Sequence, residues 1–454
     1  MTDTTSADFA PLHEQREVHT ISRPSLSYWQ DAWIRLKLNR RALVSLFIVI
    51  ALLLFTLVGP WIWRIDSAFQ DLDQVSQPPG TNRGALVVED YQPWFGDRFL
   101  AGEDLRLVES GTTQAVRLQW DALDGASGHR VYRNIFPVGP ERAYGIPLAE
   151  LLDPETDYFE DRLDLKPGRY YYSVVAIGPR GELLDNYQTI EVSVQRVTTV
   201  TEALERGLVD DASDLQVGDQ IDLIWHPLGT DYLGRDMLAR LMAGARVSLF
   251  IGIGAPFLFV LFGVAYGSMA GFIGGRTDQL MMRFADFVVA LPFLLFMILF
   301  KIAFGIGPGE SGVFPMLVAL VVLMWPATAR LVRGQILQIR EQGYISASQL
   351  LGAKTNYLIL RHMIPNTLGV VLVTVTFAIP SAIFTEAFLS FIGMGVAPPT
   401  PSWGSMSNEG IKTMLTTPHE LIFPAMFISL TVLAFNLLGD GLRDALDARM
   451  RNTE

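Results

Sequence analysis

Long apolar runs separated by polar segments dominate the pattern of this chain. Six of these runs contain only two charged residues between them, Lys301 and Glu386. A helix needs roughly 20 residues, with a range of about 17–25, to cross a hydrocarbon core of about 30 Å, and the six runs are 17 to 26 residues long. Their repetition disfavours a set of buried core helices in a soluble protein. We therefore predict an all-α polytopic membrane protein with six spans, at residues 42–63, 247–272, 287–304, 313–329, 367–392 and 421–439.

Basic residues predict the orientation of these spans. Cytoplasmic flanks of membrane helices are enriched in Lys and Arg, and such residues cluster before the first span and between the fourth and fifth spans. The N-terminal segment 1–41, the segment 330–365 and the tail 440–454 are therefore expected in the cytoplasm, and the segment 64–246 outside it. The basic residues in this argument are Arg35, Lys37, Arg40, Arg41, Arg330, Arg333, Arg340, Lys354 and Arg361.

The polar leader before the first span is longer than that of a typical cleaved signal peptide, so we expect an uncleaved membrane anchor. Leu26, Trp29, Trp33 and Leu36 recur there at helical spacing, next to the basic cluster. This pattern is typical of a helix that lies in the plane of the membrane interface. A plain cytoplasmic extension of the first span is the alternative.

The segment 64–246 differs from the rest of the chain in its charge. It holds 31 Asp and Glu against 17 Lys and Arg, a balance of −14 in a chain whose total is −12. The excess of acidic groups disfavours a role in nucleic-acid binding and suits a soluble domain outside the membrane. Attraction of cationic ligands is a second interpretation of the same charge.

Within this segment, residues 112–196 show the period of β-strands. Val116, Leu118 and Trp120 alternate with polar residues, as expected for a half-buried strand. The stretches around Trp120 and Tyr170 resemble a fibronectin type III sandwich, in which these residues would be the core tryptophan and the corner tyrosine. We interpret 112–196 as an inserted all-β sandwich that serves as a binding or spacer element.

A glycine-rich motif, residues 226–236, leads from the insert toward the second span. The motif residues singled out here are Gly229, Asp231, Gly234, Arg235 and Asp236. The glycines indicate a tight turn, and Asp231, Arg235 and Asp236 are spaced closely enough to pair with one another and fix it. A metal site made of His226, Asp231 and Asp236 is a weaker alternative.

The segment 330–365 is long for a loop between two membrane spans. Ser346-Ala347-Ser348 and Leu350-Leu351-Gly352-Ala353 are small or apolar, which favours a short helix that lies in a groove of a partner. Gly352 would end this helix or allow close backbone approach. An ordinary basic cytoplasmic loop is the alternative.

These segments together resemble the second permease subunit of dipeptide, oligopeptide and nickel ABC importers. In the coupling loop of that family, Ser346, Ala347 and Ser348 occupy the Glu-Ala-Ala positions. The resemblance implies a type I ABC importer permease fold, an outer gate at the glycine-rich motif, and coupling to the ATPases by a helix near 345–356. The coupling residues it implies are Ser346, Ala347, Ser348, Leu351, Gly352, Ala353, Arg361 and Pro365.

The same resemblance implies partners in the bacterial inner membrane. These are a second, homologous permease subunit, two cytoplasmic ABC ATPases that bind ATP-Mg, and an extracytoplasmic substrate-binding protein. Closure of the ATPases would tilt the spans and open half of a pathway for peptides or similar small solutes. Two departures from the family stand out: Ser346 replaces a glutamate, and the sandwich insert is unusual, so the substrate class stays open.

Motifs for bond chemistry are absent from the sequence. A nucleotide-binding P-loop ends in Gly-Lys-Ser/Thr, but none of the five lysines follows a glycine. No HExxH motif or nucleophile elbow occurs, and the chain has no cysteine. We therefore predict a subunit that is not an enzyme and binds no metal or cofactor itself.

Two other functional classes are weighed against a permease. An ion-coupled secondary transporter is expected to carry paired intramembrane acids or an inverted repeat, whereas the spans hold one acid, Glu386. We expect Glu386 to support helix packing, with contact to a substrate amine as the alternative. A membrane-tethered receptor or adhesion protein would use the sandwich at 112–196 as its working part.

Overall fold

The computed structural model describes residues 28–81, 83–96, 104–121, 125–138, 144–180, 183–211, 215–304 and 311–446. The chain divides into two compact units. The helical unit contains the described residues up to 63, together with 241–409 and 421–446. The β unit contains the described residues of 64–240 and the segment 410–420.

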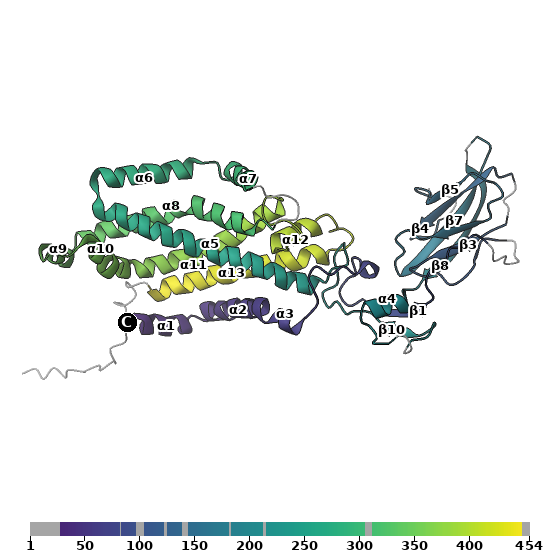
Figure 1. The fold of residues 1–454 in the computed structure, drawn as a ribbon, viewed down its shortest axis with the longest axis horizontal. Helices are drawn as coiled ribbons and strands as arrows, with labels where there is room; N and C mark the ends of the chain where they lie inside the picture. Colours follow the sequence, from purple (N-terminus) through teal and green to yellow (C-terminus); the bar gives the residue numbers. More distant parts are fainter. Residues whose placement is uncertain are drawn as a thin grey trace, which may run out of the picture. The chain divides into compact units, whose positions relative to one another are not determined.

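The helical unit is built from long apolar helices (Figure 1). Five helices of the described part are long and apolar enough to cross a membrane, and the bent pair α6–α7 raises the number to six if it counts as one span. The helices are α1 (Tyr28–Leu38), α2 (Arg40–Leu57), α3 (Gly59–Ile62), α5 (Met237–Ile273), α6 (Gly275–Ala290), α7 (Phe293–Ala303), α8 (Val313–Arg340), α9 (Gly343–Leu350), α10 (Thr355–Leu358), α11 (Ile364–Phe391), α12 (Trp403–Gly410) and α13 (His419–Leu446). A π-helical turn, Ile359–Met363, joins α10 to α11.

The third predicted span is not one straight helix in the structure. Where the sequence predicts a helix over 287–304, α6 and α7 meet at an angle of 85°. The break lies at Leu291 and Pro292, which have extended backbones with ψ of 126° and 113°. Proline lacks an N–H group and disfavours the helical conformation of the residue before it. The chain therefore turns at this dipeptide, although the residues on both sides are apolar.

Two other helices continue well beyond the predicted apolar runs. Helix α5 begins at Met237, ten residues before the predicted start at 247, and α8 continues to Arg340 past the predicted end at 329. The run of apolar residues measures only the part of a helix that lipid requires. Polar turns can extend such a helix at either end, because their side chains reach water or protein partners.

Close contact between α5 and α8 depends on three glycines at four-residue spacing. A Cβ atom at Gly263 would lie 2.9 Å from the carbonyl oxygen of Trp325, and one at Gly271 would lie 3.0 Å from that of Arg333. Between them, a Cβ atom at Gly267 would overlap the carbonyl oxygen of Ala329. Small residues at this spacing let the backbones of membrane helices approach closely. The stripe therefore fixes the contact between these two helices.

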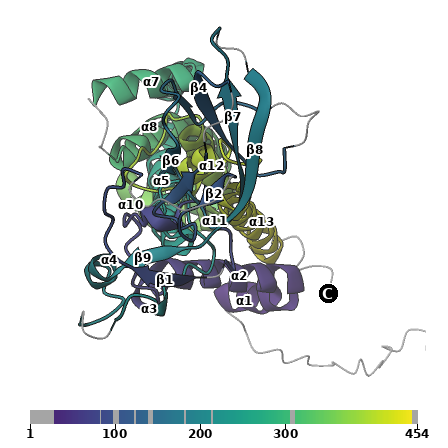
Figure 2. The same cartoon turned by 90° about the vertical axis from the view of Figure 1, so that its right-hand side faces the viewer.

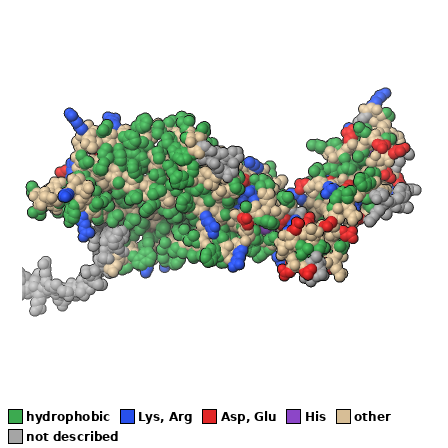
Figure 3. Space-filling view, viewed as in Figure 1, with side chains coloured by type: hydrophobic (Ala, Val, Ile, Leu, Met, Phe, Trp, Pro, Cys, Tyr) green, Lys and Arg blue, Asp and Glu red, His purple; other side chains and the backbone are tan. Residues whose placement is uncertain are grey.

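Apolar side chains remain exposed over much of the helical unit. Figure 3 shows them covering the face on view, and Phe250, Phe257 and Phe287 are 59–62% exposed. A soluble protein rarely exposes a continuous apolar surface of this extent. The surface is suited to lipid or to another membrane subunit.

The β unit contains a small three-stranded sheet and two further sheets, of three and four strands, that share a core (Figure 2). The small sheet has the order β10-β1-β9, and the other two have the orders β2-β3-β6 and β5-β4-β7-β8. The elements are β1 (Gly84–Val88), β2 (Arg106–Leu107), β3 (Val116–Gln119), β4 (Gly128–Asn134), β5 (Ala149–Leu151), β6 (Tyr158–Asp161), β7 (Gly168–Ile177), β8 (Leu183–Val194), β9 (Val197–Thr199), β10 (Gln220–Asp222), the helix α4 (Val200–Glu205) and a 3-10 turn, Leu72–Gln74.

The sheets β2-β3-β6 and β5-β4-β7-β8 share an apolar core. Leu118, Trp120, Val131 and Tyr172 are fully buried in one cluster, as the alternating pattern of the strands requires. The phenol of Tyr172 donates a hydrogen bond of 2.6 Å to Asp161. Burial and this bond to a carboxylate both raise the pKa of Tyr172. The phenol therefore stays protonated and joins the two sheets.

Candidate functional site

The segment that we predict to lie in the cytoplasm and to couple to an ATPase forms the short helix α9. Ser346, Ala347 and Ser348 lie in its middle, and Leu350 is its last residue. The N–H groups of Leu351 and Ala353 donate to the carbonyls of Ala347 and Ser348. These bonds close the last turn of the helix.

Gly352 ends α9 in a left-handed conformation, with a φ of +86°. Other residues disfavour this conformation, whereas glycine adopts it without steric cost. The turn leaves Leu350 and Leu351 exposed at 89% and 90%. None of the described residues covers these two adjacent leucines at the end of the helix.

The base of this segment is anchored to the helical unit. Ile345, Leu358 and Met363 are fully buried there, and the amide of Asn366 donates to the phenol of Tyr344 at 2.9 Å. The other two coupling candidates lie after α10: Arg361 is exposed in the π-helical turn, and Pro365 lies in the first turn of α11. A firmly held base with an exposed apolar tip is suited to transmit force from a partner.

The glycine-rich motif of the β unit is held together by buried ion pairs. Asp231 accepts from the Nε of Arg235 at 2.7 Å and also pairs with Arg240. All three side chains are at least 93% buried. Gly229 and Gly234 have φ values of +77° and +73°, and a Cβ atom at Gly234 would overlap the backbone of Asp71. The motif is therefore a rigid turn that depends on both its glycines and its charges.

Asp236 also has partners that the sequence did not indicate. It lies 2.7 Å from the Nδ1 of His226 and accepts from the N–H of Ala239 at 2.6 Å, so it caps the start of α5. The ion pair of Asp231 with Arg235 is one of the local pairings that the sequence predicted. No group of three potential metal ligands occurs among the described residues.

Glu386 lies fully buried on α11 within a cluster of serines. The hydroxyls of Ser248 and Ser390 each donate to its carboxyl group at 2.8 Å. The backbone N–H of Trp403, the first residue of α12, donates to the Ser248 hydroxyl. These contacts join α5, α11 and α12, and they favour the packing interpretation of Glu386. At the end of α7, Lys301 donates to the carbonyl of Gly393 at 3.1 Å.

Sequence reasoning missed an ion pair between α6 and α8. The guanidinium of Arg333 donates to both carboxyl oxygens of Asp278, at 2.5 and 2.6 Å. A few residues later, Arg340 donates to the carbonyls of Gly271 and Phe272 at the end of α5. In the sequence, Arg333 is only one of the basic residues of the predicted cytoplasmic segment 330–365. Nothing in it indicates a partner 55 positions away.

A cavity of about 480 Å³ lies in the helical unit between α5, α8 and α11. Its lining is mostly apolar, with a few hydroxyl groups on α8 and α11. Residues that line it include Phe259, Leu320, Met324, Phe377, Ser381 and Thr385. No sequence pattern had indicated these residues, because their side chains come from three separate helices.

Comparison with known proteins gives two family matches. Residues 263–452 match the binding-protein-dependent transport system inner membrane component, and residues 27–79 match the N-terminal TM domain of oligopeptide transport permease C. Most of the β unit lies between the two matched ranges.

Individual relatives are similar over about half of this chain. The oligopeptide transport system permease protein OppC of Bacillus subtilis is 49% identical over 226 residues, which are 50% of this chain and 72% of the relative. The dipeptide permease DppC of the same species is 48% identical over 50% of this chain and 69% of the relative. The glutathione permease GsiD of Escherichia coli is 42% identical over 50% of this chain and 73% of the relative. A solved structure of the MetNI methionine ABC transporter aligns with a TM-score of 0.38 and 16% identity, over 46% of this chain and 98% of that chain.

These matches establish the class of the protein: it is a multi-pass permease of the inner membrane, and its relatives are transport permeases, not enzymes. The chain belongs to the family of oligopeptide and dipeptide permeases of binding-protein-dependent transport systems. It is therefore a transmembrane subunit of an ABC importer, a class in which separate subunits hydrolyse ATP. The fold and function predicted from the sequence are confirmed at this level.

Proposed function

We propose that α9 couples this permease to a cytoplasmic ATPase. The observation that carries the proposal is the exposed pair Leu350 and Leu351, held next to the left-handed Gly352 on an anchored base. An apolar tip of this kind gains free energy when it enters a groove, at roughly 25 cal/mol per Å² of apolar area buried. The ATPase would supply that groove.

Coupling in this chain relies on shape and not on an ion pair at Ser346. The serine is exposed on α9 and carries no charge, so it cannot pair with a basic residue of a partner. Its hydroxyl can still donate or accept a hydrogen bond. Arg361, which is exposed in the π-helical turn after α10, is the charged candidate for contact with an acidic surface of the partner.

The proposed mechanism is alternating access in an assembly of five proteins. This chain and a second, homologous permease would each form half of the pathway, with two ATPases binding ATP-Mg inside and a substrate-binding protein outside. Helix α8 lines the cavity and continues to Arg340, just before α9. Movement of α9 would therefore act directly on a helix of the pathway. An ATPase that binds two conformations of the permease with different affinity would shift the equilibrium between them through this contact.

The substrate class that we propose is peptides or similar small solutes. Its support is that the curated relatives are oligopeptide, dipeptide and glutathione permeases. The cavity between α5, α8 and α11 would be this chain's share of the pathway. Its apolar lining with scattered hydroxyls suits varied side chains, because no charge selects among them.

In the proposed topology both termini are cytoplasmic and the insert is extracytoplasmic. We assign 112–196 to a fibronectin type III-like sandwich on three grounds: the sheets of three and four strands, the buried Trp120, and Tyr170. The phenol of Tyr170 accepts from the N–H of Lys166 at 3.1 Å, as a corner tyrosine contacts upstream backbone. The motif at Asp231 would lie at the outer membrane surface, at the start of α5.

Substitution of the exposed leucines tests the coupling proposal. The double variant Leu350→Ser, Leu351→Ser should insert and fold normally, because neither side chain is buried, yet bind the ATPases at least tenfold more weakly. Leu415→Ser, at a leucine 94% exposed in the β unit, is the matched control. Complexes are measured by co-purification of tagged subunits and by ATP-driven uptake in vesicles. Unchanged association, or uptake without ATP or partners, would contradict the proposal.

A further inference from the structure

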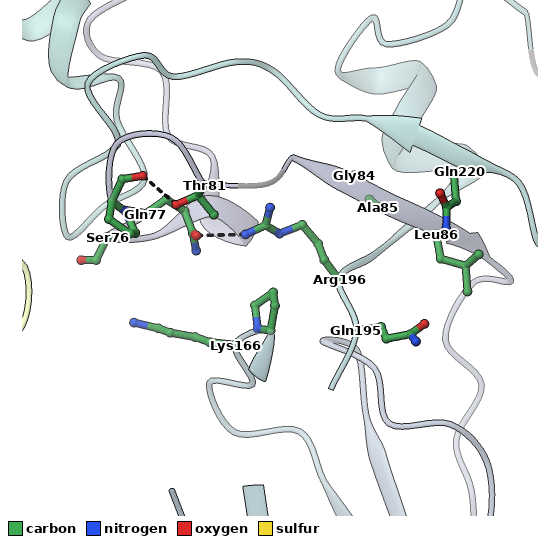
Figure 4. Close-up of a pocket in the computed structure, with 12 residues that line it drawn as sticks. Ser76, Gln77, Thr81, Gly84, Ala85, Leu86, Lys166, Gln195, Arg196 and Gln220 are labelled. Carbon is green, nitrogen blue, oxygen red and sulfur yellow. Dashed lines mark hydrogen bonds between the residues drawn. The ribbon is translucent and has the colours of Figure 1, made fainter. Parts of the chain in front are cut away.

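The β unit contains a polar pocket of about 510 Å³ that the transport function does not use (Figure 4). It lies between the turn that precedes β1, strand β1 itself, the junction of β8 with β9, and the loop that precedes β7. Its lining contains two basic side chains, three glutamines and no acidic residue. The residues with polar side chains that matter here are Gln77, Lys166, Gln195, Arg196 and Gln220. Such a lining is unusual in an insert whose balance is −14.

Arg196 is a fixed cation in this pocket. Its side chain is buried, with 6% of the residue exposed, and its Nη2 donates to the amide oxygen of Gln77 at 2.9 Å. The backbone on both sides is also held: the carbonyl of Arg196 accepts from Leu86, and the N–H of Val197 donates to Thr113. The guanidinium is therefore oriented before any ligand arrives, which lowers the entropic cost of binding.

Lys166 supplies a second, more exposed charge. Figure 4 shows its side chain extending in the same direction as that of Arg196, toward the end of the pocket at Ser76 and Gln77. Its ammonium group makes no ion pair or hydrogen bond with the described residues. Asp164 lines a smaller adjoining cavity with Lys166, but the two do not pair. The lysine is thus available to a ligand.

We propose that this pocket binds the carboxylate of a small, amide-containing solute such as a short peptide with a free C-terminus. Arginine and lysine supply charge-assisted hydrogen bonds to a carboxylate, and the glutamine amides can both donate to and accept from peptide groups. The volume lies within the range of roughly 300–1,000 Å³ that is usual for small-molecule sites. No lining residue begins a helix, so the lining has no helix N-terminus of the kind that often binds phosphate.

The inference goes beyond transport, because it gives the insert a binding step of its own. A solute would be held outside the membrane-spanning helices, on a unit that lies between the two ranges matched by the family. Binding at this pocket can be measured without ATPases or the second permease. Its failure would leave the coupling proposal untouched, and the converse also holds.

Calorimetry on the full chain in lipid nanodiscs tests the proposal. The probes are the dipeptide Ala-Ala, its C-terminal amide and inorganic phosphate. We expect Ala-Ala to bind at least tenfold more tightly than the amide or phosphate, and Lys166→Gln to weaken its binding about tenfold, which corresponds to about 1.4 kcal/mol. Arg169→Gln removes the same charge three residues away, at a side chain 74% exposed outside the pocket, and should have no effect.

Arg196 requires a second comparison, because its loss could disturb the fold. Arg196→Lys keeps a cation, and Gln77→Ala removes its partner without removing charge. Both should weaken binding of Ala-Ala while the circular dichroism of the protein stays unchanged. Equal affinity for the acid and the amide, or equal effects of Lys166→Gln and Arg169→Gln, would overturn the assignment. Binding of an acidic protein but of no small carboxylate would overturn it as well.

Discussion

Arg333 on α8 holds Asp278 on α6 through both oxygens of its carboxyl group, at 2.5 and 2.6 Å. Asp278 lies near the start of α6, before the apolar run 287–304 from which the third span was predicted. Asp278 is 6% exposed as a residue. The contact therefore fixes the first helix of the bent pair against the helix that continues toward α9.

Breaking this pair should loosen the helical unit. Asp278→Asn keeps the shape but removes the charge, and we expect a loss of about 1.5–3 kcal/mol, the range for hydrogen bonds to charged groups. The exchanged double variant Asp278→Arg, Arg333→Asp should recover part of the loss. A double-mutant cycle of Asp278→Arg, Arg333→Asp and the double variant, followed by thermal unfolding in detergent, measures the coupling between the two residues. Additive effects of the two single changes would show that the pair contributes nothing.

The glycine stripe on α5 allows a comparison within one helix. Gly267→Ala should destabilise the protein by about 1–3 kcal/mol through overpacking, because a Cβ atom there overlaps the backbone of Ala329. Gly254→Ala is the control, since its Cβ atom would meet only Leu317 at an ordinary 3.6 Å. That change should be neutral or stabilise the helix by a few tenths of a kcal/mol. Midpoints of thermal unfolding decide the matter, and equal midpoints would contradict the close contact.

Asp231 should matter far more than an exposed acid of the same unit. Asp231→Asn removes the buried negative charge that Arg235 and Arg240 share, at an expected cost of about 3–5 kcal/mol. Asp222→Asn removes only a surface pair with Arg83, whose side chains are 60% and 43% exposed, and should cost under about 1 kcal/mol. Hydrogen exchange of peptides that cover residues 226–240 measures the local effect. Similar protection in both variants would refute the structural role of Asp231.

His129 makes the sandwich sensitive to acid. Its ring packs edge-on to Trp120, with ring centroids 5.5 Å apart, and neither nitrogen has a hydrogen-bond partner among the described residues. Burial lowers the pKa of His129 below its usual value of 6.5. The unfolded chain therefore binds the proton more readily, so this contribution to stability is complete above about pH 6.5 and is lost as the pH falls toward the lowered pKa.

His129→Phe should remove that acid sensitivity, because the substituted ring cannot bind a proton. Hydrogen exchange of peptides from β4 and β7, corrected for the intrinsic effect of pH, should show increasing exposure below pH 6.5 in the parent chain only. Tyr170→Phe, which removes a phenol elsewhere in the sandwich, is the control and should keep the sensitivity. Identical pH profiles of the parent and His129→Phe would exclude this histidine.

Gly352 offers a test of the left-handed turn after α9. A Cβ atom there would meet no other atom within 4 Å, so the only cost of Gly352→Leu inside the chain is backbone strain of roughly 1–2 kcal/mol. We expect ATPase association and transport to fall while membrane insertion is unchanged. Gly352→Asn should retain more association, because asparagine tolerates this conformation better. Unaltered complexes with the leucine variant would remove the assignment.

Local patterns in the sequence predicted much of the fold. The lengths of the apolar runs indicated the membrane helices, and the alternation at Val116, Leu118 and Trp120 indicated a strand whose buried side the structure shows. Gly352 was expected to end a helix, and its φ of +86° does so. Each of these features depends on residues close together in the chain, where spacing translates directly into geometry.

Long-range features could not be found in this way. The 85° bend at Leu291-Pro292 lies within a continuous apolar run, where proline signals a kink but not its size. Asp231 takes Arg240 as a second partner, nine positions away, and Asp236 takes His226. The polar pocket of the β unit combines residues from positions 76 to 220. Such arrangements follow from the folded sheets and helices, and no short motif encodes them.

The sandwich leaves and re-enters the small sheet through two strands that lie side by side. Strands β1 and β9 pair in parallel, with Leu86 opposite Val197 and Val88 opposite Thr199. The two strands pair over only three residue pairs. A short linker would therefore be enough to connect the end of β1 directly to the start of β9. We therefore expect the sandwich to be replaceable: another compact domain whose two ends lie close together could be inserted between β1 and β9, and these two strands would stay paired.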